Sequence, residues 1–368
     1  MIDKIIETTK ELIKFESVAE NKDQIEACLE YCIDYFSGKN VVVQRFENEN
    51  ISPVLVISNC EGLNFDVMTL GHVDVVPAEA DQFKPEIKDG KLYGRGAMDM
   101  KGPVAVALNT MDYILENNLD VTFGIVITTD EETTATGASY LAKNTDITAK
   151  ILLDVDVAND IEEIITKCKN VQIVELYAEG EACHGAFPWE GSDAIEKIIR
   201  TFNKLREKIP YYAKGENEPD SQWVDTLHMG KISAGKAANV VAPSAYACLN
   251  FRLTEKTPAD VFKKMMDDAV EEGVKWEVKM SANPVIIDES NKFFKKYKEC
   301  VEKHVGKEVK LIQIGGATDS RHINNKGVPV AMHSVSGKGM HSIGEYCVIE
   351  SMEQLAKIQI DFIDGFKS

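Results

Sequence analysis

Two side chains that can bind a metal ion lie close together at the end of an apolar run. The run NFDVMTLGHVDVV, residues 64–76, is typical of a buried strand, and it ends with His72 and Asp74. Residues two apart in an extended chain point to the same side, so the imidazole and the carboxylate share a face. A carboxylate beside an imidazole fixes the tautomer of a metal-binding histidine. Strand ends that enter solvent also collect polar residues, so this pair alone leaves both interpretations open.

A second chemical signal is the stretch GRGAMDMKG, residues 94–102, in which glycines flank Asp99 just before an expected helix. Glycine permits unusual backbone angles and the close approach of a ligand. Asp99 could therefore bind a cation that lies beside the turn. A plain turn with Asp99 as the helix cap explains the same residues, and the stretch by itself does not separate the two.

Two further apolar runs end in carboxylates. The run VTFGIVITT leads into Glu131 and Glu132, and the run LLDVDV contains Asp154 and Asp156. Adjacent carboxylates repel each other unless something positive holds them, and successive residues of an extended chain point opposite ways. Glu131 and Glu132 can therefore do different work, one binding a cation and the other moving a proton. Acidic solvated loops are the competing interpretation.

The glycine-rich stretch SGKGMHSIGEY adds His341, whereas His333 in the apolar run VPVAMHSV is interpreted as a histidine without a functional role. A single loop histidine carries little information. The whole set of histidine, aspartate and glutamate is harder to explain by chance, because ligands gather at the carboxyl ends of strands in open α/β sheets. A hard or borderline divalent cation is the natural common partner of these side chains.

The elements expected to hold these residues alternate between strand and helix, which indicates an α/β sheet. The expected strands cover residues 41–46, 53–58, 65–76, 121–129 and 149–157, with a helix at 102–118. From residue 171 the order becomes β-α-β-β-α-β, the split βαβ arrangement. We expect a catalytic α/β domain of residues 1–170 and 284–368 that carries an inserted α+β domain of residues 171–283.

The composition excludes several classes of protein. The chain of 368 residues has a formal charge of −19 and no long run of Lys and Arg, which argues against a surface for nucleic acid. Its eight cysteines are scattered without a CxxC pair, so neither a disulfide framework nor a thiolate zinc site is expected. The N-terminus does not read as a signal peptide, and no apolar run reaches membrane-spanning length. We expect a cytoplasmic protein with no membrane partner.

The stretches GHVDVVPA, GRGAMDMKG, DEE, GGATDSR and MHSIGEY, taken in this order, resemble the M20 family of co-catalytic zinc hydrolases. This family includes dipeptidases, carboxypeptidases, aminoacylases and the acetylornithine and succinyl-diaminopimelate deacylases. The resemblance runs from the first helix to the last, and the ordered set of motifs is highly specific. It implies a zinc-exopeptidase-like catalytic domain with an inserted ferredoxin-like lid that forms a homodimer.

The resemblance also implies the ligands of two divalent metal ions, which would be zinc or else cobalt or manganese. One ion would be bound by His72, Asp99 and Asp156, and the other by Asp99, Glu132 and His341. Asp74 would orient His72, and Glu131 would take the proton from the attacking water and pass it to the leaving amine. The peptide bond after Asp99 is expected to be cis. Asp154 is the alternative ligand if Asp156 does not face the metal.

Four further residues match positions that the family uses for substrate. In the lid, GEACHGAFP places His184 where it would reach across a dimer to stabilise the oxyanion of the tetrahedral intermediate. AANVVAP places Asn239 at a substrate contact, and CLNFRL places Arg252 at the substrate carboxylate. Arg321 of ATDSR could serve the same carboxylate, because a planar guanidinium forms two hydrogen bonds to it. His184 could instead be a plain surface residue, and Arg252 could belong to a structural ion pair.

The function implied is dinuclear zinc-dependent hydrolysis of the amide bond of a small peptide, such as a di- or tripeptide, or of an N-acyl amino acid with a free carboxylate. Aspartate at position 156 resembles the dipeptidase and aminopeptidase branches, whereas GGATDSR resembles the deacylases. One alternative is a biosynthetic deacylase of the acetylornithine or succinyl-diaminopimelate type. Another, from a different class, is an inactive metal-binding or scaffold protein with the same fold. A third is an acidic globular protein that binds no metal.

Overall fold

The computed structural model describes residues 1–156 and 160–367, and the chain divides into two compact units. The first unit consists of Met1–Thr166, Ile286–Ile312 and Thr318–Ser368, and the second of Lys167–Val285 and Gln313–Ala317. The insert expected at residues 171–283 falls inside the second unit. No sequence pattern indicated that the short segment Gln313–Ala317 would join it.

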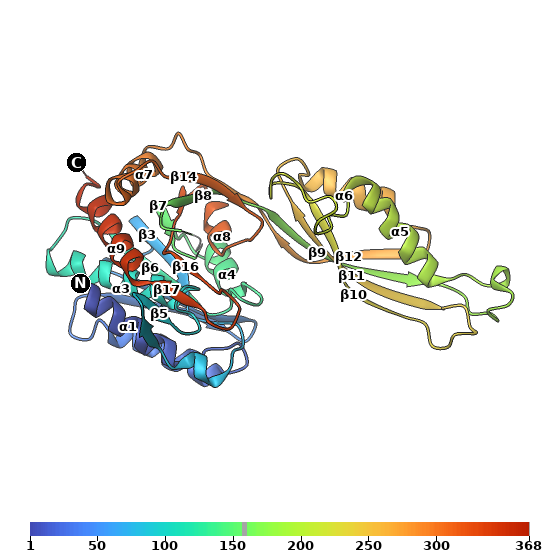
Figure 1. The fold of residues 1–368 in the computed structure, drawn as a ribbon, viewed down its shortest axis with the longest axis horizontal. Helices are drawn as coiled ribbons and strands as arrows, with labels where there is room; N and C mark the ends of the chain where they lie inside the picture. The colour runs from blue at the N-terminus through green and yellow to red at the C-terminus, as the bar shows by residue number, and fades with distance from the viewer. Residues whose placement is uncertain (157–159, 368) are drawn as a thin grey trace. The chain divides into compact units, whose positions relative to one another are not determined.

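A mixed sheet runs through the first unit (Figure 1). Its strands follow the order β1-β2-β6-β3-β7-β15-β8-β13, and β14 pairs with β8. These strands are β1 (Val42–Asn48), β2 (Ile51–Ser58), β3 (Asn64–His72), β6 (Phe123–Thr128), β7 (Thr148–Asp154), β8 (Glu163–Cys168), β13 (Val285–Ile286), β14 (Lys310–Ile314) and β15 (Val330–Met332).

Four neighbouring strands determine where the polar residues of the first unit gather. β3 is parallel to β6 and β7, and β7 is parallel to β15, so the carboxyl ends of all four strands lie at one edge. The register pairs His72 with Thr128 of β6 and Leu70 with Asp154 of β7. The three central strands are almost wholly buried, as parallel strands between layers of helices are. The loops after His72, Thr128 and Asp154 therefore begin close to one another.

Helices cover this sheet, and one of them holds the loop that contains Asp99. The helices are α1 (Ile2–Lys14), α2 (Lys22–Asp34), α3 (Lys101–Glu116), α4 (Thr136–Asn144), α7 (Lys292–Val305), α8 (Ser320–Asn324) and α9 (Ile349–Asp364). Figure 1 shows α3 between α1 and α9, and nearly all residues of α3 are buried. Because α3 begins at Lys101, directly after Asp99 and Met100, its packing fixes the end of this loop.

A small antiparallel sheet connects two distant parts of the first unit. It consists of β4 (Glu86–Lys88), β5 (Lys91–Tyr93), β16 (Gly337–Lys338) and β17 (Tyr346–Val348), in the order β16-β17-β5-β4. β5 leads into the loop that contains Asp99, and the loop that contains His341 lies between β16 and β17. Pairing of β17 with β5 therefore brings the two loops together.

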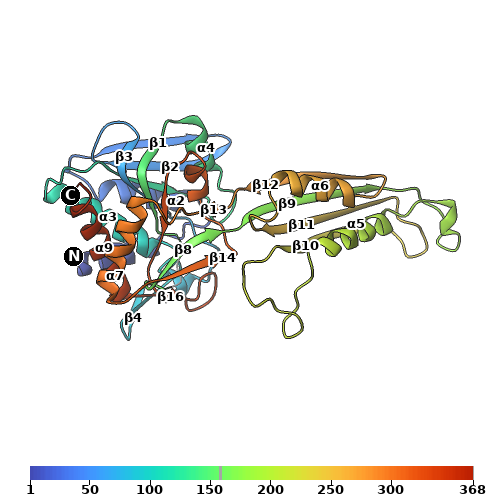
Figure 2. The same ribbon diagram turned by 90° about the horizontal axis from the view of Figure 1, so that it is seen from above.

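The second unit is a four-stranded antiparallel sheet with two helices on one face (Figure 2). The sheet order is β10-β11-β9-β12. Its elements are β9 (Asn170–Glu179), α5 (Ala194–Lys208), β10 (Thr226–Ala234), β11 (Ser244–Leu253), α6 (Ala259–Ala269) and β12 (Val274–Ala282). This is the β-α-β-β-α-β order that the sequence predicted. Alternate residues of β11 are buried because they pack against the helices while their neighbours face away.

In the described part of the chain, no helix combines the length and the apolar character that crossing a bilayer requires.

Candidate metal centre

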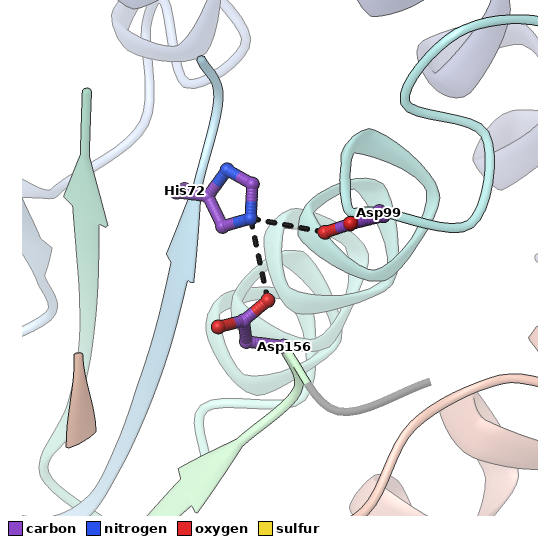
Figure 3. Close-up of side chains that lie close together, drawn as sticks. All are labelled: His72, Asp99 and Asp156. Carbon is purple, nitrogen blue, oxygen red and sulfur yellow. Dashed lines mark hydrogen bonds and ion pairs between the residues drawn. The ribbon is translucent and has the colours of Figure 1, made fainter. Parts of the chain in front are cut away.

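His72 ends β3 and faces two carboxylates from neighbouring loops (Figure 3). Its Nε2 lies 3.1 Å from Asp99 Oδ1 and 3.3 Å from Asp156 Oδ1. Asp99 comes from the loop before α3, and Asp156 follows β7, the strand beside β3. All three side chains are buried or nearly so. The group offers one nitrogen and two oxygen ligands from three different loops.

Asp99 also belongs to a second group. Its Oδ2 lies 3.1 Å from Nε2 of His341, and the same nitrogen lies 3.0 Å from Oε1 of Glu132. In each group the potential ligand atoms lie within 4.8 Å of one another. Asp99 therefore presents Oδ1 to the first group and Oδ2 to the second. The structure thus assembles the same two sets of residues that the resemblance grouped as ligands.

The loops that carry Asp99 and His341 have unusual backbone geometry. The peptide bond between Asp99 and Met100 is cis, as the resemblance implied. His341 has a φ of 58°, and Gly339 and Gly344 on either side of it have φ of 86° and 85°. This left-handed region favours glycine, so the glycines of SGKGMHSIGEY permit the tight loop that aims the imidazole of His341 at Asp99.

Asp74 connects His72 to the loop that carries the two glutamates. The Nδ1 of His72 lies 2.9 Å from the backbone oxygen of Asp74 and 3.4 Å from its carboxylate Oδ1. The backbone oxygen is thus the closer of the two groups that orient the imidazole. The carboxylate accepts hydrogen bonds from the backbone N–H groups of Glu131 and Glu132, at 3.3 and 3.1 Å. One aspartate therefore fixes parts of both loops.

Two other carboxylates at this edge of the sheet hold backbone instead of joining either group. Asp154 accepts hydrogen bonds from the N–H of Asp156 at 3.0 Å and from the hydroxyl of Thr318 at 2.6 Å. Asp130 accepts hydrogen bonds from the N–H and the hydroxyl of Thr136, at 2.7 and 2.5 Å. The geometry therefore favours Asp156 over Asp154 as the residue that faces His72.

Carboxylates crowd the site. Burial raises the pKa of Asp156 well above its ordinary range. Burial also raises the pKa of Glu131 well above its ordinary range, and the nearby Asp156 adds to this increase. The pKa of Glu132 is raised by burial and by Asp99. Carboxyl groups placed so close together ionise jointly only when a positive charge lies among them, so this site is suited to a cation.

The two imidazoles hold Asp99 in its ionised form. Burial acts to lower the pKa of His72, but Asp156 and hydrogen bonds to two further aspartates hold it well above its ordinary value. The hydrogen bond with Asp99 contributes most to raising the pKa of His341 to about 9. Burial acts to raise the pKa of Asp99, yet its hydrogen bonds with both histidines leave that pKa below its ordinary range. Asp99, the residue common to both groups, is therefore an ionised carboxylate.

Sequence reasoning missed two buried residues beside the site, Glu345 and Arg95. The carboxylate of Glu345 accepts a hydrogen bond from the backbone N–H of Asp99 at 3.1 Å, and Arg95 forms an ion pair with the same carboxylate. Both lie inside stretches that carry the family resemblance, MHSIGEY and GRGAMDMKG. The available signal was that each of these stretches contains a charged residue of opposite sign, Arg95 in one and Glu345 in the other, which could have indicated an ion pair between them.

The second unit contains three of the remaining predicted residues. His184 is exposed, and its loop pairs with the loop that contains Asn239. His184 forms a β-bridge with Val240, and the N–H of Gly185 donates to the backbone oxygen of Asn239 at 2.8 Å. The ring Nδ1 of His184 accepts a hydrogen bond from the N–H of Ala186 at 3.1 Å. Arg252 lies on β11, where its Nε donates to Asn250 at 3.2 Å. His184 and Asn239 are therefore neighbours, as a joint role requires.

Arg321 lies in α8 of the first unit and is buried. Burial raises the pKa of the nearby Asp319 to about 6, although the positive charge of Arg321 acts to lower it. Among the described residues, Arg321 Nε and both carboxylate oxygens of Asp319 lack a hydrogen-bond partner. Arg321 therefore retains hydrogen-bonding capacity, although it lies inside the protein.

Several known proteins are similar to this chain in sequence or in structure. The model of peptidase family M20/M25/M40 matches residues 68–364. An uncharacterized metallohydrolase from Methanocaldococcus jannaschii is 22% identical, with 97% of this chain and 98% of the relative covered. A succinyl-diaminopimelate desuccinylase from Rickettsia bellii is 25% identical, with 96% and 94% covered. The solved structure of aminopeptidase PepT from Bacillus cereus has a TM-score of 0.81 at 20% identity, with 100% of this chain and 99% of that chain covered.

The structural likeness shows a shared fold, and the family match spans both groups of potential ligands. The chain therefore belongs to peptidase family M20/M25/M40 and is a hydrolase of the metallopeptidase type.

Proposed function

We propose that this protein is a dinuclear metal-dependent hydrolase that cleaves the amide bond of a small peptide or an N-acyl amino acid with a free carboxylate. The observation that carries the proposal is the pair of ligand groups that share Asp99. Each group offers three protein ligands, which leaves coordination positions for water and substrate, as catalytic metal sites require.

The donor atoms of both groups fit a divalent ion. His72, Asp99 and Asp156 would hold one ion, and Asp99, Glu132 and His341 would hold the other. A mixture of imidazole nitrogen and carboxylate oxygen suits zinc, which we propose as the resident metal, and also accommodates cobalt or manganese. When bound, the ions lower the pKa of a water molecule and polarise the amide carbonyl.

Glu131 is the residue we assign to proton transfer. Its carboxylate would accept a proton from the attacking water and deliver it to the nitrogen of the leaving amine. Asp74 supports these separate roles, because it accepts hydrogen bonds from the N–H groups of Glu131 and Glu132 and so fixes the backbone that carries both side chains. Glu132 lies within reach of His341, whereas Glu131 belongs to neither ligand group.

Residues of the second unit and of α8 would bind the substrate. We assign His184 to the carbonyl oxygen that gains charge during the reaction, with Asn239 beside it. Arg252 and Arg321 are assigned to the free carboxylate of the substrate, since a guanidinium can hold both of its oxygens. The paired loops of His184 and Asn239 support a joint role for these two residues.

The similar proteins support two substrate classes, peptides and N-acyl amino acids. The matched structure from Bacillus cereus is an aminopeptidase, whereas the relative from Rickettsia bellii is a desuccinylase. We favour di- and tripeptides because aspartate at position 156 resembles the peptidase branches. A deacylase of the acetylornithine or succinyl-diaminopimelate type is the second candidate. Among the described residues the eight cysteines form no disulfide, which fits our placement of the reaction in the reducing cytoplasm.

The experiment is a measurement of amine release from di- and tripeptides and from N-acetyl and N-succinyl amino acids, with zinc, cobalt or manganese supplied. We expect turnover of peptides, and we expect Glu131→Ala to lower kcat by about 10²–10⁴-fold, the usual contribution of a general base. Glu131→Ala should retain the metal content of the wild type because Glu131 is not a ligand. Glu131→Gln, which keeps the size of the side chain, should be equally impaired.

Three results would change the proposal. Turnover confined to one acylated amino acid would assign the protein to the deacylases. Full activity of both Glu131 variants would remove the assigned base. Dialysed protein that retains no metal and hydrolyses nothing would favour the acidic globular protein that binds no metal.

A further inference from the structure

Glu345 is a buried carboxylate that no step of the proposed reaction uses. Its side chain is fully buried, four residues beyond His341. The carboxylate accepts three backbone hydrogen bonds, from the N–H groups of Gly96 at 3.0 Å, Met98 at 3.0 Å and Asp99 at 3.1 Å. A single side chain from the loop of His341 thus binds most of the loop that ends in Asp99.

Arg95 completes this arrangement from the other direction. Its side chain is 3% exposed, and Nη1 donates to Oε2 of Glu345. The second terminal nitrogen, Nη2, lies 3.4 Å from the backbone oxygen of Ser342, the residue next to His341. Arg95 therefore reaches from the loop of Asp99 to the loop of His341, while Glu345 reaches the opposite way. Hydrogen bonds between ionised groups in a buried setting are among the strongest that side chains form.

The small sheet brings these two residues into reach. β17 pairs with β5 so that Tyr346 lies opposite Tyr93, and the N–H of Gly94 donates to the backbone oxygen of Glu345 at 3.1 Å. The loops that contain Asp99 and His341 leave this sheet side by side. The side chains of Glu345 and Arg95 then bridge them just beyond the last backbone pair.

The glycines of the GRG stretch allow the loop to curl around the carboxylate. Gly94 and Gly96 have φ of 152° and 83°, values that other residues rarely adopt. A Cβ atom on Gly96 would lie 2.9 Å from Cδ of the buried Lys101. The curled backbone points the N–H groups of residues 96, 98 and 99 at one acceptor, which is how short backbone segments form anion-binding nests.

We infer that Glu345 and Arg95 form a positioning clamp that holds Asp99 and His341 at the separation needed to bind the second metal ion. The inference rests on the proposed function, because it assumes that Asp99, Glu132 and His341 are ligands. Among the hydrogen bonds of the described residues, neither clamp residue contacts His72 or Asp156. The first ion depends on the clamp only through Asp99, whereas the second depends on it through both Asp99 and His341.

The test measures zinc affinity at both sites of the full chain by titration against a competing chelator, together with cobalt absorption spectra. Glu345→Gln keeps the shape of the side chain but turns an NH₂ group toward the backbone donors. We expect the second ion to bind about 10–100-fold more weakly, the usual loss for a residue that supports a ligand, with a much smaller change for the first ion. Turnover should return at high zinc concentration.

A matched control and two further variants separate positioning from folding. Glu353→Gln removes a partly exposed carboxylate of α9 that pairs with Lys357 at 2.7 Å, and it should leave both affinities unchanged. Arg95→Lys keeps the charge but cannot reach Glu345 and Ser342 together, so it should weaken the second ion in the same selective way. Glu345→Asp, which keeps the carboxylate, should recover part of the affinity that Glu345→Gln loses. If circular dichroism shows that Glu345→Gln does not fold, the zinc affinities of Arg95→Lys decide whether the clamp positions the ligands of the second ion.

The outcomes distinguish this inference from the proposed function. A wild-type protein that binds fewer than two ions overturns the proposed function itself. If the wild type binds two ions and the clamp variants bind both ions with unchanged or equally weakened affinity, only the inference of the clamp is overturned. Selective weakening of the second ion, with the cobalt spectrum of the first preserved, supports both.

Discussion

At the scale of single residues, Asp74 offers the sharpest test of how the site is held together. Its carboxylate lies 3.4 Å from Nδ1 of His72 and accepts hydrogen bonds from the backbone of Glu131 and Glu132. Asp74→Asn turns an NH₂ group toward at least one of these donors. We expect zinc affinity to fall by about 10–100-fold, since residues that orient a ligand contribute on that scale. Titration of the variant with zinc and a competing chelator measures the change.

Asp66 is the matched control for Asp74. It lies near the start of β3, is buried, and accepts a hydrogen bond from the N–H of Thr122 at 3.0 Å. Asp66→Asn disturbs a similar buried interaction at the far end of the strand, so it should lower thermal stability and leave zinc affinity unchanged. Equal zinc affinities for Asp74→Asn and the wild type would show that the backbone oxygen of Asp74 suffices to orient His72.

The residues that could be grouped from the sequence are those whose side chains we assign to metal binding. His72, Asp156 and Glu132 follow apolar runs, where a polar residue needs an explanation, and the structure places them at adjacent strand ends. The role of Glu345 could not be predicted, because its partners are mostly backbone N–H groups. Every residue but proline has such a group, so the sequence does not mark it.

At the scale of elements, the contact between α7 and β15 contains a titratable group that should make stability depend on pH. His333 follows β15 and is buried; it lies 3.1 Å from the hydroxyl of Tyr297 on α7 and 2.8 Å from the backbone oxygen of Ile161. Burial lowers the pKa of His333 to about 4. The ordinary value in an unfolded chain is about 6.5, so the unfolded state takes up the proton first as the pH falls.

The stability that neutral His333 provides is therefore complete above about pH 6.5 and is lost as the pH falls toward about 4. Between about pH 7.5 and pH 5, the wild type should lose about 2 kcal/mol more of its free energy of unfolding than His333→Gln does. Urea unfolding in the presence of a chelator measures both proteins. Tyr297→Phe, which keeps the histidine, should be less stable at each pH but should show the wild-type dependence on pH.

The elements themselves were predictable where burial dictates the pattern. The apolar runs of β3, β6 and β7 are recognisable because both faces of these strands are covered. The helix α4 and the strand β8 were not anticipated. α4 has only nine residues, TGASYLAKN, and packs against β2 and α8, so tertiary contacts rather than a long apolar stripe stabilise it.

At the scale of the whole molecule, the second unit presents apolar surface beside His184. Trp189 is 75% exposed, Phe187 is 47% exposed, and Val240, which pairs with His184, is 41% exposed. The rings of Phe187 and Trp189 lie 5.8 Å apart. Exposed apolar clusters of this kind commonly mark interaction surfaces. The order of the expected strands and helices predicted an insert that falls inside the second unit, but the contribution of Gln313–Ala317 to that unit depends on contacts between distant residues.

We expect this protein to sediment as a homodimer in which His184 of one subunit serves the site of the other. Mixing two inactive variants tests both parts of this prediction. Glu131→Ala lacks the base, and His184→Ala lacks the histidine of the second unit. In a mixed dimer with exchange across the two-fold axis, one of the two sites would receive both intact residues, while the other would receive neither.

An equal mixture that equilibrates would contain mixed dimers as half of its molecules, so about a quarter of the wild-type activity should return. If His184 acts within its own subunit, every site of the mixed dimer lacks one residue and no activity returns. A protein that sediments as a monomer and still turns over at a normal rate would also exclude a role for His184 in the site of another subunit. Because each variant alone is expected to fold and to bind metal, recovered activity can come only from a site shared between two subunits.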